Sequence, residues 1–125
     1  MIHLDTSVAI LGLRRGTAED RAISQWILDG KALRIAAPAW AEFLCGPIAP
    51  HEVRSAADLL GPPLDFTAAD AELAADLFNV AGRRRGSMVD CMIAAVAIRR
   101  GAALATANTA DFARFAPRGL RLAQP

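Results

Sequence analysis

Short apolar segments alternate along the chain with longer segments in which apolar residues recur at helical spacing. The short segments are typical of strands in a sheet that is buried on both faces. We expect strands at residues 2–4, 33–37, 64–66, 103–106 and 120–122. We expect helices that begin at residue 8, span 18–29, 38–46, 52–60, 68–81 and 88–100, and include a short one around residues 111–112.

Residues that favour helix ends mark several of these boundaries. A hydroxyl before a helix accepts a hydrogen bond from a free backbone N–H, and glycine adopts the conformation that closes a helix. We expect side-chain caps from Thr6 and Ser7, from Thr67 and from Ser87, and a helix end at Gly101. These signals divide the chain into alternating strands and helices.

This alternation favours an α/β fold, with helices on both faces of a short parallel sheet. The chain has 125 residues, 54% of them hydrophobic and 22% charged, which suits one folded domain over residues 1–125. The sequence contains no repeat, linker or low-complexity segment. In parallel sheets of this kind, ligands bind beyond the carboxyl ends of the strands.

Four acidic residues follow short strands or interrupt apolar runs: Asp5, Glu42, Asp90 and Asp111. Asp90 is the clearest case, because it is the only polar residue in the run 88–98. A carboxylate that is buried without a partner is costly, so something must compensate its charge. The other three acids each follow a strand, and Asp90 at a helix start can point to the same edge of the sheet.

Each acid also has a purely structural explanation. Asp5 can cap a helix, and Glu42 lies on the face of its helix opposite the apolar residues. Asp90 lies three residues after Ser87, as in a capping box, and Asp111 suits the first turn of a helix. Their joint placement at one edge of the sheet favours a common site instead.

Clustered carboxylates are hard oxygen ligands suited to Mg²⁺ or Mn²⁺. A cation held in this way binds phosphate oxygens and activates water, which points to cleavage of phosphodiesters. Other catalytic patterns are missing from the sequence: His3 and His51 lie in unrelated contexts, and Cys45 and Cys91 have no partner at zinc-ligand spacing. We expect both cysteines to be reduced and buried.

The net charge is only +1, so no overall field favours nucleic acid. Arginines cluster at Arg83, Arg84 and Arg85, and again at Arg99 and Arg100. Basic residues at helix ends complement the helix dipole, and we favour that explanation for the second cluster. The triplet lies a few residues before the third acid, so contact with an RNA backbone is an equal alternative there.

The four acids lie in segments that resemble the four motifs of PIN-domain ribonucleases, and in particular those of VapC-type toxins from bacterial toxin–antitoxin pairs. These segments are Asp5-Thr6-Ser7 after a short apolar start, residues 41–46 around Glu42, residues 90–95 from Asp90, and residues 106–112 around Asp111. The resemblance covers nearly the whole chain, in the family's order and spacing. It implies a three-layer α/β/α sandwich with a short, mostly parallel sheet.

The same resemblance implies an endoribonuclease that depends on Mg²⁺ or Mn²⁺. Asp5, Glu42 and Asp90 are expected to be the central metal ligands, with Asp111 as the fourth acid. Some family members carry the acid where this chain has Asn108, so Asn108 is the alternative that completes the site, as a residue that supports it by hydrogen bonding.

Supporting roles follow from the same motifs. Thr6 or Ser7, together with Thr106, are expected to orient Asp5 and a bound water. The implied reaction is in-line attack of an activated water on an RNA phosphodiester. The implied partners are a second copy of the chain, in a homodimer, and a cognate antitoxin, in a heterotetramer or larger complex.

Other classes of protein share parts of this pattern. A haloacid-dehalogenase-like phosphatase needs an Asp where this chain has Ser7, and a response-regulator receiver needs a late lysine, whereas the only lysine is Lys31. A domain that keeps the fold and only binds RNA or protein is the stronger alternative. Helices 18–29 and 52–60 are candidate surfaces for the antitoxin. The chain shows no basic leader and no apolar run of membrane-spanning length, so we expect it to be cytoplasmic.

Overall fold

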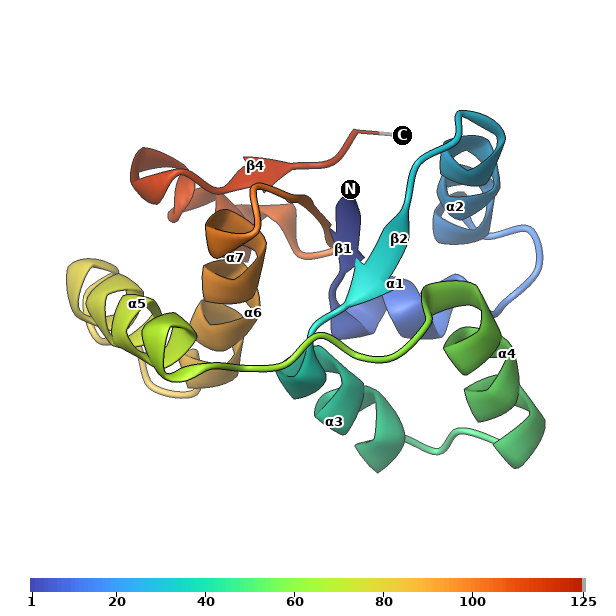
Figure 1. Cartoon of the computed structure of the whole chain (residues 1–125), viewed down its shortest axis with the longest axis horizontal. Helices are drawn as coiled ribbons and strands as arrows, with labels where there is room; N and C mark the ends of the chain where they lie inside the picture. The colour runs from blue at the N-terminus through green and yellow to red at the C-terminus, as the bar shows by residue number, and fades with distance from the viewer. Residues whose placement is uncertain (125) are drawn as a thin grey trace.

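The computed structural model describes residues 1–124 and gives a four-stranded sheet surrounded by helices (Figure 1). The elements are β1 (Ile2–Leu4), α1 (Thr6–Leu11), α2 (Ala18–Leu28), β2 (Leu33–Ile35), α3 (Ala37–Cys45), α4 (Pro50–Leu60), α5 (Ala68–Val80), α6 (Met88–Arg99), β3 (Ala103–Ala105), α7 (Thr109–Ala113), a 3₁₀ turn (Ala116–Arg118) and β4 (Arg121–Leu122). Across residues 1–124, no helix combines the length and hydropathy that crossing a membrane requires.

The strands are all parallel and lie in the order β2-β1-β3-β4. In register, Ile2 pairs with Leu33 on one side and with Ala103 on the other. In Figure 1, α5 and α6 lie to the left of β1 and β2, and α2 lies to the right, so the strands lie among the helices. The expected α/β sandwich with a parallel sheet is therefore confirmed.

Helix α6 is the central helix of the core. Its residues Ala94, Ala95, Val96 and Ala97 are completely buried. Alanine side chains are short, so they let the backbone of α6 approach its neighbours closely, and α5 packs along it. The apolar run that predicted a buried helix is confirmed.

Some strand and helix limits differ from the expected ones. Strand β2 ends at Ile35, and the expected strand at 64–66 is reduced to a single parallel bridge between Leu64 and Ala36. Within residues 1–124, residues 65 and 66 have no strand to pair with, because the chain beside them enters α3 at Ala37. Helix α4 begins at Pro50 rather than at residue 52, because proline suits the first turn of a helix.

Two of the expected helix caps are wrong. Asp5, rather than Thr6 or Ser7, caps α1 by accepting a hydrogen bond from the backbone N–H of Val8. Ser87 precedes α6 but makes no side-chain cap, so the capping box with Asp90 does not form. Only the Thr67 cap, on α5, is confirmed.

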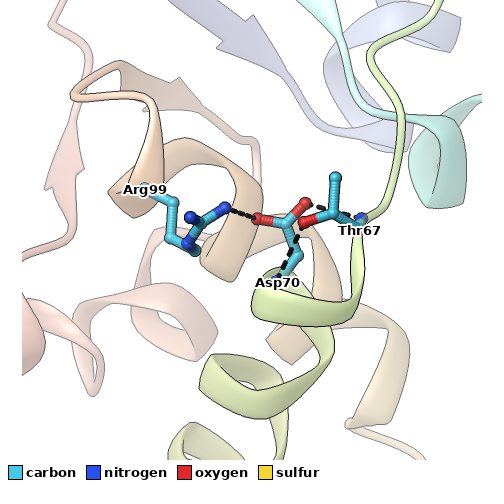
Figure 2. A network of polar contacts seen from close by, with 3 residues as sticks. All are labelled: Thr67, Asp70 and Arg99. Carbon is cyan, nitrogen blue, oxygen red and sulfur yellow. Dashed lines mark hydrogen bonds and ion pairs between the residues drawn. The ribbon is translucent and has the colours of Figure 1, made fainter.

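Asp70 joins the start of α5 to the end of α6 (Figure 2). One of its oxygens accepts the backbone N–H of Thr67 at 2.8 Å, and the other accepts Nη1 of Arg99 at 3.0 Å. Its side chain is only 2% exposed. Burial alone would raise the pKa of Asp70, but the hydrogen bonds from Thr67 and Arg99 outweigh burial and hold the pKa below its ordinary value.

Replacing Asp70 by asparagine is expected to lower the free energy of unfolding at pH 7 by about 1–3 kcal/mol, because Arg99 and Thr67 lose a charged acceptor. Asp76 on the same helix provides a matched control, since it pairs with Arg118 at 2.9 Å in a half-exposed setting. Asp76→Asn should cost about 0–1 kcal/mol, as exposed ion pairs do. Urea unfolding of both variants measures the difference, and equal losses would contradict the role given to Asp70.

The effect of Asp70 should also depend on pH. Its pKa is depressed in the folded chain, so its contribution is fully present above the unfolded-state value of about 3.9 and is lost as the pH falls through the folded-state pKa. The stability gap between wild type and Asp70→Asn should therefore close in acid, which unfolding curves measured between pH 7 and pH 2 will follow.

Candidate metal centre

The acids predicted from the sequence approach one another at the carboxyl edge of the sheet. Asp5 directly follows β1, Glu42 lies on α3, which follows β2, and Asp90 lies in the first turn of α6. In Figure 1, α3 continues directly below β2, and α1 begins beside it. This is the edge at which the N-termini of the helices after parallel strands collect, and it is where such sheets bind ligands.

Asp5 is the most constrained of the acids, with only 3% of its surface exposed. Its Oδ1 accepts hydrogen bonds from the backbone N–H of Val8 at 3.0 Å and from Oγ of Ser7 at 2.7 Å. Its Oδ2 accepts a hydrogen bond from Oγ1 of Thr106 at 2.5 Å. These three donors fix the orientation of the Asp5 carboxylate.

The hydroxyls of Ser7 and Thr106 also hold the loop after β3. Ser7 Oγ accepts the backbone N–H of Ala107 at 3.1 Å, and Thr106 Oγ1 accepts the backbone N–H of Asn108 at 2.9 Å. Each hydroxyl thus accepts a hydrogen bond from a backbone N–H of this loop and donates one to Asp5. The expectation that these hydroxyls orient Asp5 matches this geometry.

Thr6 acts on a different acid from the one expected. Its Oγ1 donates to Oε1 of Glu42 at 2.8 Å and lies 3.3 Å from the carbonyl oxygen of Ala39. The bond links α1 to α3 and holds the exposed side chain of Glu42 at the site. The sequence suggested an exposed Glu42, and Thr6 explains why it nevertheless contributes to the cluster.

The surroundings of Asp90 disfavour its charged form. Burial raises its pKa above the ordinary value, and the negative charge of Glu42 raises it further. Arg114 opposes this increase, whereas Asp111 and Asp5 add to it. A carboxylate surrounded by like charges at half burial is a favourable place for a cation.

A pocket of about 260 Å³ opens between these elements. Its lining contains three of the acids, two of the hydroxyl residues, one amide and two apolar residues: Asp5, Glu42, Asp90, Thr6, Ser7, Asn108, Ile10 and Ile93. Asn108 lines the pocket and Asp111 does not. Of the two alternatives for the fourth position, Asn108 is thus nearer to the cavity.

Asp111 lies in the first turn of α7, where it forms an ion pair with Arg84 at 3.0 Å. Both side chains are substantially exposed, at 58% for Arg84 and 42% for Asp111. Arg83 packs over the ring of Phe78 and donates to Asn79, so it turns away from the acids. Arg85 is exposed and makes no hydrogen bond to any residue of the described chain, 1–124.

Arg114 is a residue that the sequence patterns did not reveal. It lies at the end of α7, its guanidinium carbon is 4.6 Å from the ring centre of Phe115, and its charge acts on Asp90. Its Nε and Nη2 atoms are buried without a hydrogen-bond partner within residues 1–124. The only available signal was its position three residues after Asp111, one helical turn along.

The histidines and cysteines take no part in this site. His3 is buried in β1, where burial and the nearby Arg100 and Arg34 lower its pKa to about 4 and keep it neutral. Cys91 is buried, Cys45 is exposed rather than buried as expected, and both are free thiols. The remaining candidate ligand atoms in the pocket are oxygens.

A set of carboxylate and hydroxyl oxygens fits Mg²⁺ or Mn²⁺ better than a softer ion. The raised pKa of Asp90 supports this fit, because a divalent cation would relieve the repulsion from Glu42. Among residues 1–124, no three His, Cys, Asp or Glu side chains lie close enough to form a complete cation cage. Ligation by three acids therefore requires side-chain rotation from the positions described here.

Comparison with known proteins places the chain. The family model for the PIN domain matches residues 2–117. No curated protein matches the chain.

Several solved structures are similar in fold. VapBC2 from Rickettsia felis, bound to a promoter DNA fragment, contains a chain with 22% identity and a TM-score of 0.76, with 98% of each chain covered. DNA-bound VapBC from Salmonella typhimurium gives 22% identity and a TM-score of 0.74, with 98% of this chain and 96% of that chain covered. A toxin–antitoxin complex from Klebsiella pneumoniae gives 22% identity and a TM-score of 0.69, with 90% of this chain and 91% of that chain covered.

At this level of identity, the structures establish likeness of fold alone. The family match extends from the first strand to the 3₁₀ turn after α7 and includes all four acids. This chain belongs to the PIN domain family.

Proposed function

We propose that this chain is a metal-dependent endoribonuclease that acts as the toxin of a toxin–antitoxin pair. The observation that carries the proposal is the meeting of Asp5, Glu42 and Asp90 in one pocket of a PIN fold, with hydroxyls oriented on two of them. PIN domains are nucleases as a family, and the similar solved structures include VapBC and toxin–antitoxin complexes.

Asp5, Glu42 and Asp90 would hold a Mg²⁺ or Mn²⁺ ion, with Asn108 or Asp111 completing the site. When bound, such an ion lowers the pKa of water and supplies positive charge for phosphate oxygens. The chain's own residues prepare this site. Thr106 and Ser7 keep the Asp5 carboxylate oriented, and Thr6 keeps Glu42 turned inward.

RNA would reach the pocket past the basic residues at its edge. We assign the phosphate contacts to Arg85, which makes no hydrogen bond within residues 1–124, and to Arg114, whose charge acts on Asp90. Arg83 is engaged by Phe78 and Asn79, and Arg84 by Asp111. Phosphate contacts position a strand without reading its sequence. Target choice would then depend on RNA shape and unstacked bases.

An apolar surface suits the antitoxin. Ile27 and Leu28 on α2 are 49% and 81% exposed, and Leu59 on α4 is 41% exposed. Ile27 and Leu59 line a common groove beside β2, together with Leu33. An amphipathic antitoxin segment would bury these side chains. We further propose that the chain forms a homodimer and, with the antitoxin, a heterotetramer or larger complex.

Cleavage of a mixed RNA pool is expected to require Mn²⁺ or Mg²⁺ and to stop with EDTA. Asp90→Asn and Glu42→Gln should each lower the rate by at least about 100-fold, since even residues that support metal ligands contribute 10- to 100-fold. Asp65→Asn and Glu72→Gln are matched controls at exposed positions and should cleave as wild type does. Full activity in Asp90→Asn would sink the assignment of the site. No cleavage by the folded wild type would favour a domain that only binds.

Loss of cleavage in Asp90→Asn should come with a gain in stability of the metal-free protein. Because the folded-state pKa of Asp90 is raised, its ionised form destabilises the fold, and this cost appears as the pH rises above the unfolded-state pKa of about 3.9. Asp90→Asn should thus melt above wild type at pH 7 and at the same temperature near pH 3, whereas Asp65→Asn should show no such difference. Thermal melts in EDTA test this, and a lower melting temperature for Asp90→Asn at pH 7 would contradict it.

Toxin activity predicts an effect on living cells. Induced expression of the wild-type chain in a bacterial host should arrest growth and lower the content of intact target RNA. Asp90→Asn, expressed to the same level, should permit normal growth. Growth curves with immunoblots for expression measure this. Equal arrest by both proteins would show that toxicity does not depend on the acidic cluster.

A further inference from the structure

The loop between α5 and α6 brings one arginine to the fourth acid. Arg84 Nη1 lies 3.0 Å from Oδ1 of Asp111, although the two residues are 27 positions apart. Asp111 does not line the pocket, whereas Asn108, three residues earlier, does. The ion pair therefore holds the fourth carboxylate at the rim of the acidic cluster, outside its cavity.

The backbone of the loop selects Arg84 from the three arginines. Arg83 is the one described residue other than glycine with a positive φ, at 55°, and Gly82 and Gly86 also have positive φ. This backbone conformation turns the side chain of Arg83 over the ring of Phe78. Both the Oγ and the backbone N–H of Ser87 donate to the carbonyl oxygen of Arg84, at 2.6 and 3.2 Å.

These bonds tie Arg84 to the helix that carries Asp90. The carbonyl oxygen of Ser87 accepts the N–H of Cys91, so the loop and the first turn of α6 are continuous in hydrogen bonding. Arg84 is thus attached at a fixed place relative to the acids. The pair that it forms with Asp111 is nevertheless exposed, and exposed ion pairs are weak enough to exchange with a competing cation.

We propose that Arg84 is a positioning residue for Asp111. In the metal-free chain it keeps the Asp111 carboxylate at the rim, and a divalent cation entering the acidic cluster competes with it for that carboxylate. The exchange leaves the guanidinium free to meet a backbone phosphate of the RNA. This inference rests on the proposed function, because it concerns the same metal site.

The test is Mn²⁺ affinity, measured by calorimetry on purified metal-free protein without RNA. Arg84→Gln removes the competitor, so it should bind Mn²⁺ about twofold to fivefold more tightly than Arg85→Gln, the range expected for an exposed pair. Arg85→Gln is the matched control, because it removes the same charge from the same loop without breaking the pair. The advantage should shrink at high salt, which screens exposed charges.

A second pair of variants isolates Asp111. In an Asp111→Asn background, Arg84→Gln and Arg85→Gln should bind Mn²⁺ equally, since no carboxylate remains for Arg84 to hold. Equal affinities with Asp111 intact, or weaker binding by Arg84→Gln, would overturn the inference while leaving the nuclease proposal in place. Failure of the wild-type chain to bind Mn²⁺ at all would overturn both.

Discussion

The carboxylate of Asp5 is the interaction on which the site and its surroundings depend. It directly follows the central strand β1 and caps α1 by accepting a hydrogen bond from the backbone N–H of Val8. It also accepts a hydrogen bond from the hydroxyl of Thr106, which follows β3. One side chain therefore joins two strands and a helix at the edge of the sheet. Because three donors hold its two oxygens, the fold itself fixes the position of this carboxylate. The same residue has a structural and a proposed ligand role, so its substitution affects both at once, and Asp90 and Glu42 test the chemistry more cleanly.

The fold also offsets part of the repulsion among the acids. Asp5 is an N-cap, and Asp90 and Asp111 lie in the first turns of α6 and α7, where the helix dipole favours negative charge. The helices that follow parallel strands begin at one edge of the sheet. Their N-termini therefore favour negative charge at the edge where the acids meet. Burial, followed by the negative charge of Glu42, still raises the pKa of Asp90. A cation would complete the balance, which links the architecture to the proposed chemistry.

Hydrophobic periodicity predicted α2, α5, α6 and the parallel sheet, because that pattern reports burial directly. It did not predict which of several adjacent polar residues caps a helix. Asp5, Thr6 and Ser7 can all serve before α1, and the choice is made by distant partners, Glu42 for Thr6 and Ala107 for Ser7. Asp5, Glu42 and Asp111 could be singled out as candidates by their places after strands, and Asp90 by the apolar run around it. The contacts of Arg84 and Arg114 were not, because they depend on the path of a loop and the end of a short helix.

Asp90 is positioned by packing rather than by hydrogen bonds. Its carboxylate accepts no hydrogen bond within residues 1–124, yet the helix beneath it is buried along most of its length. At the other end of α6, about 13 Å away by the rise of a helix, Arg99 is tied to Asp70 (Figure 2). The core and this ion pair fix the helix, and so they fix Asp90 without occupying its oxygens. Both oxygens of Asp90 thus remain available to a cation, whereas the carboxylates of Asp5 and Glu42 are oriented by hydroxyl donors, as supporting hydrogen bonds orient metal ligands.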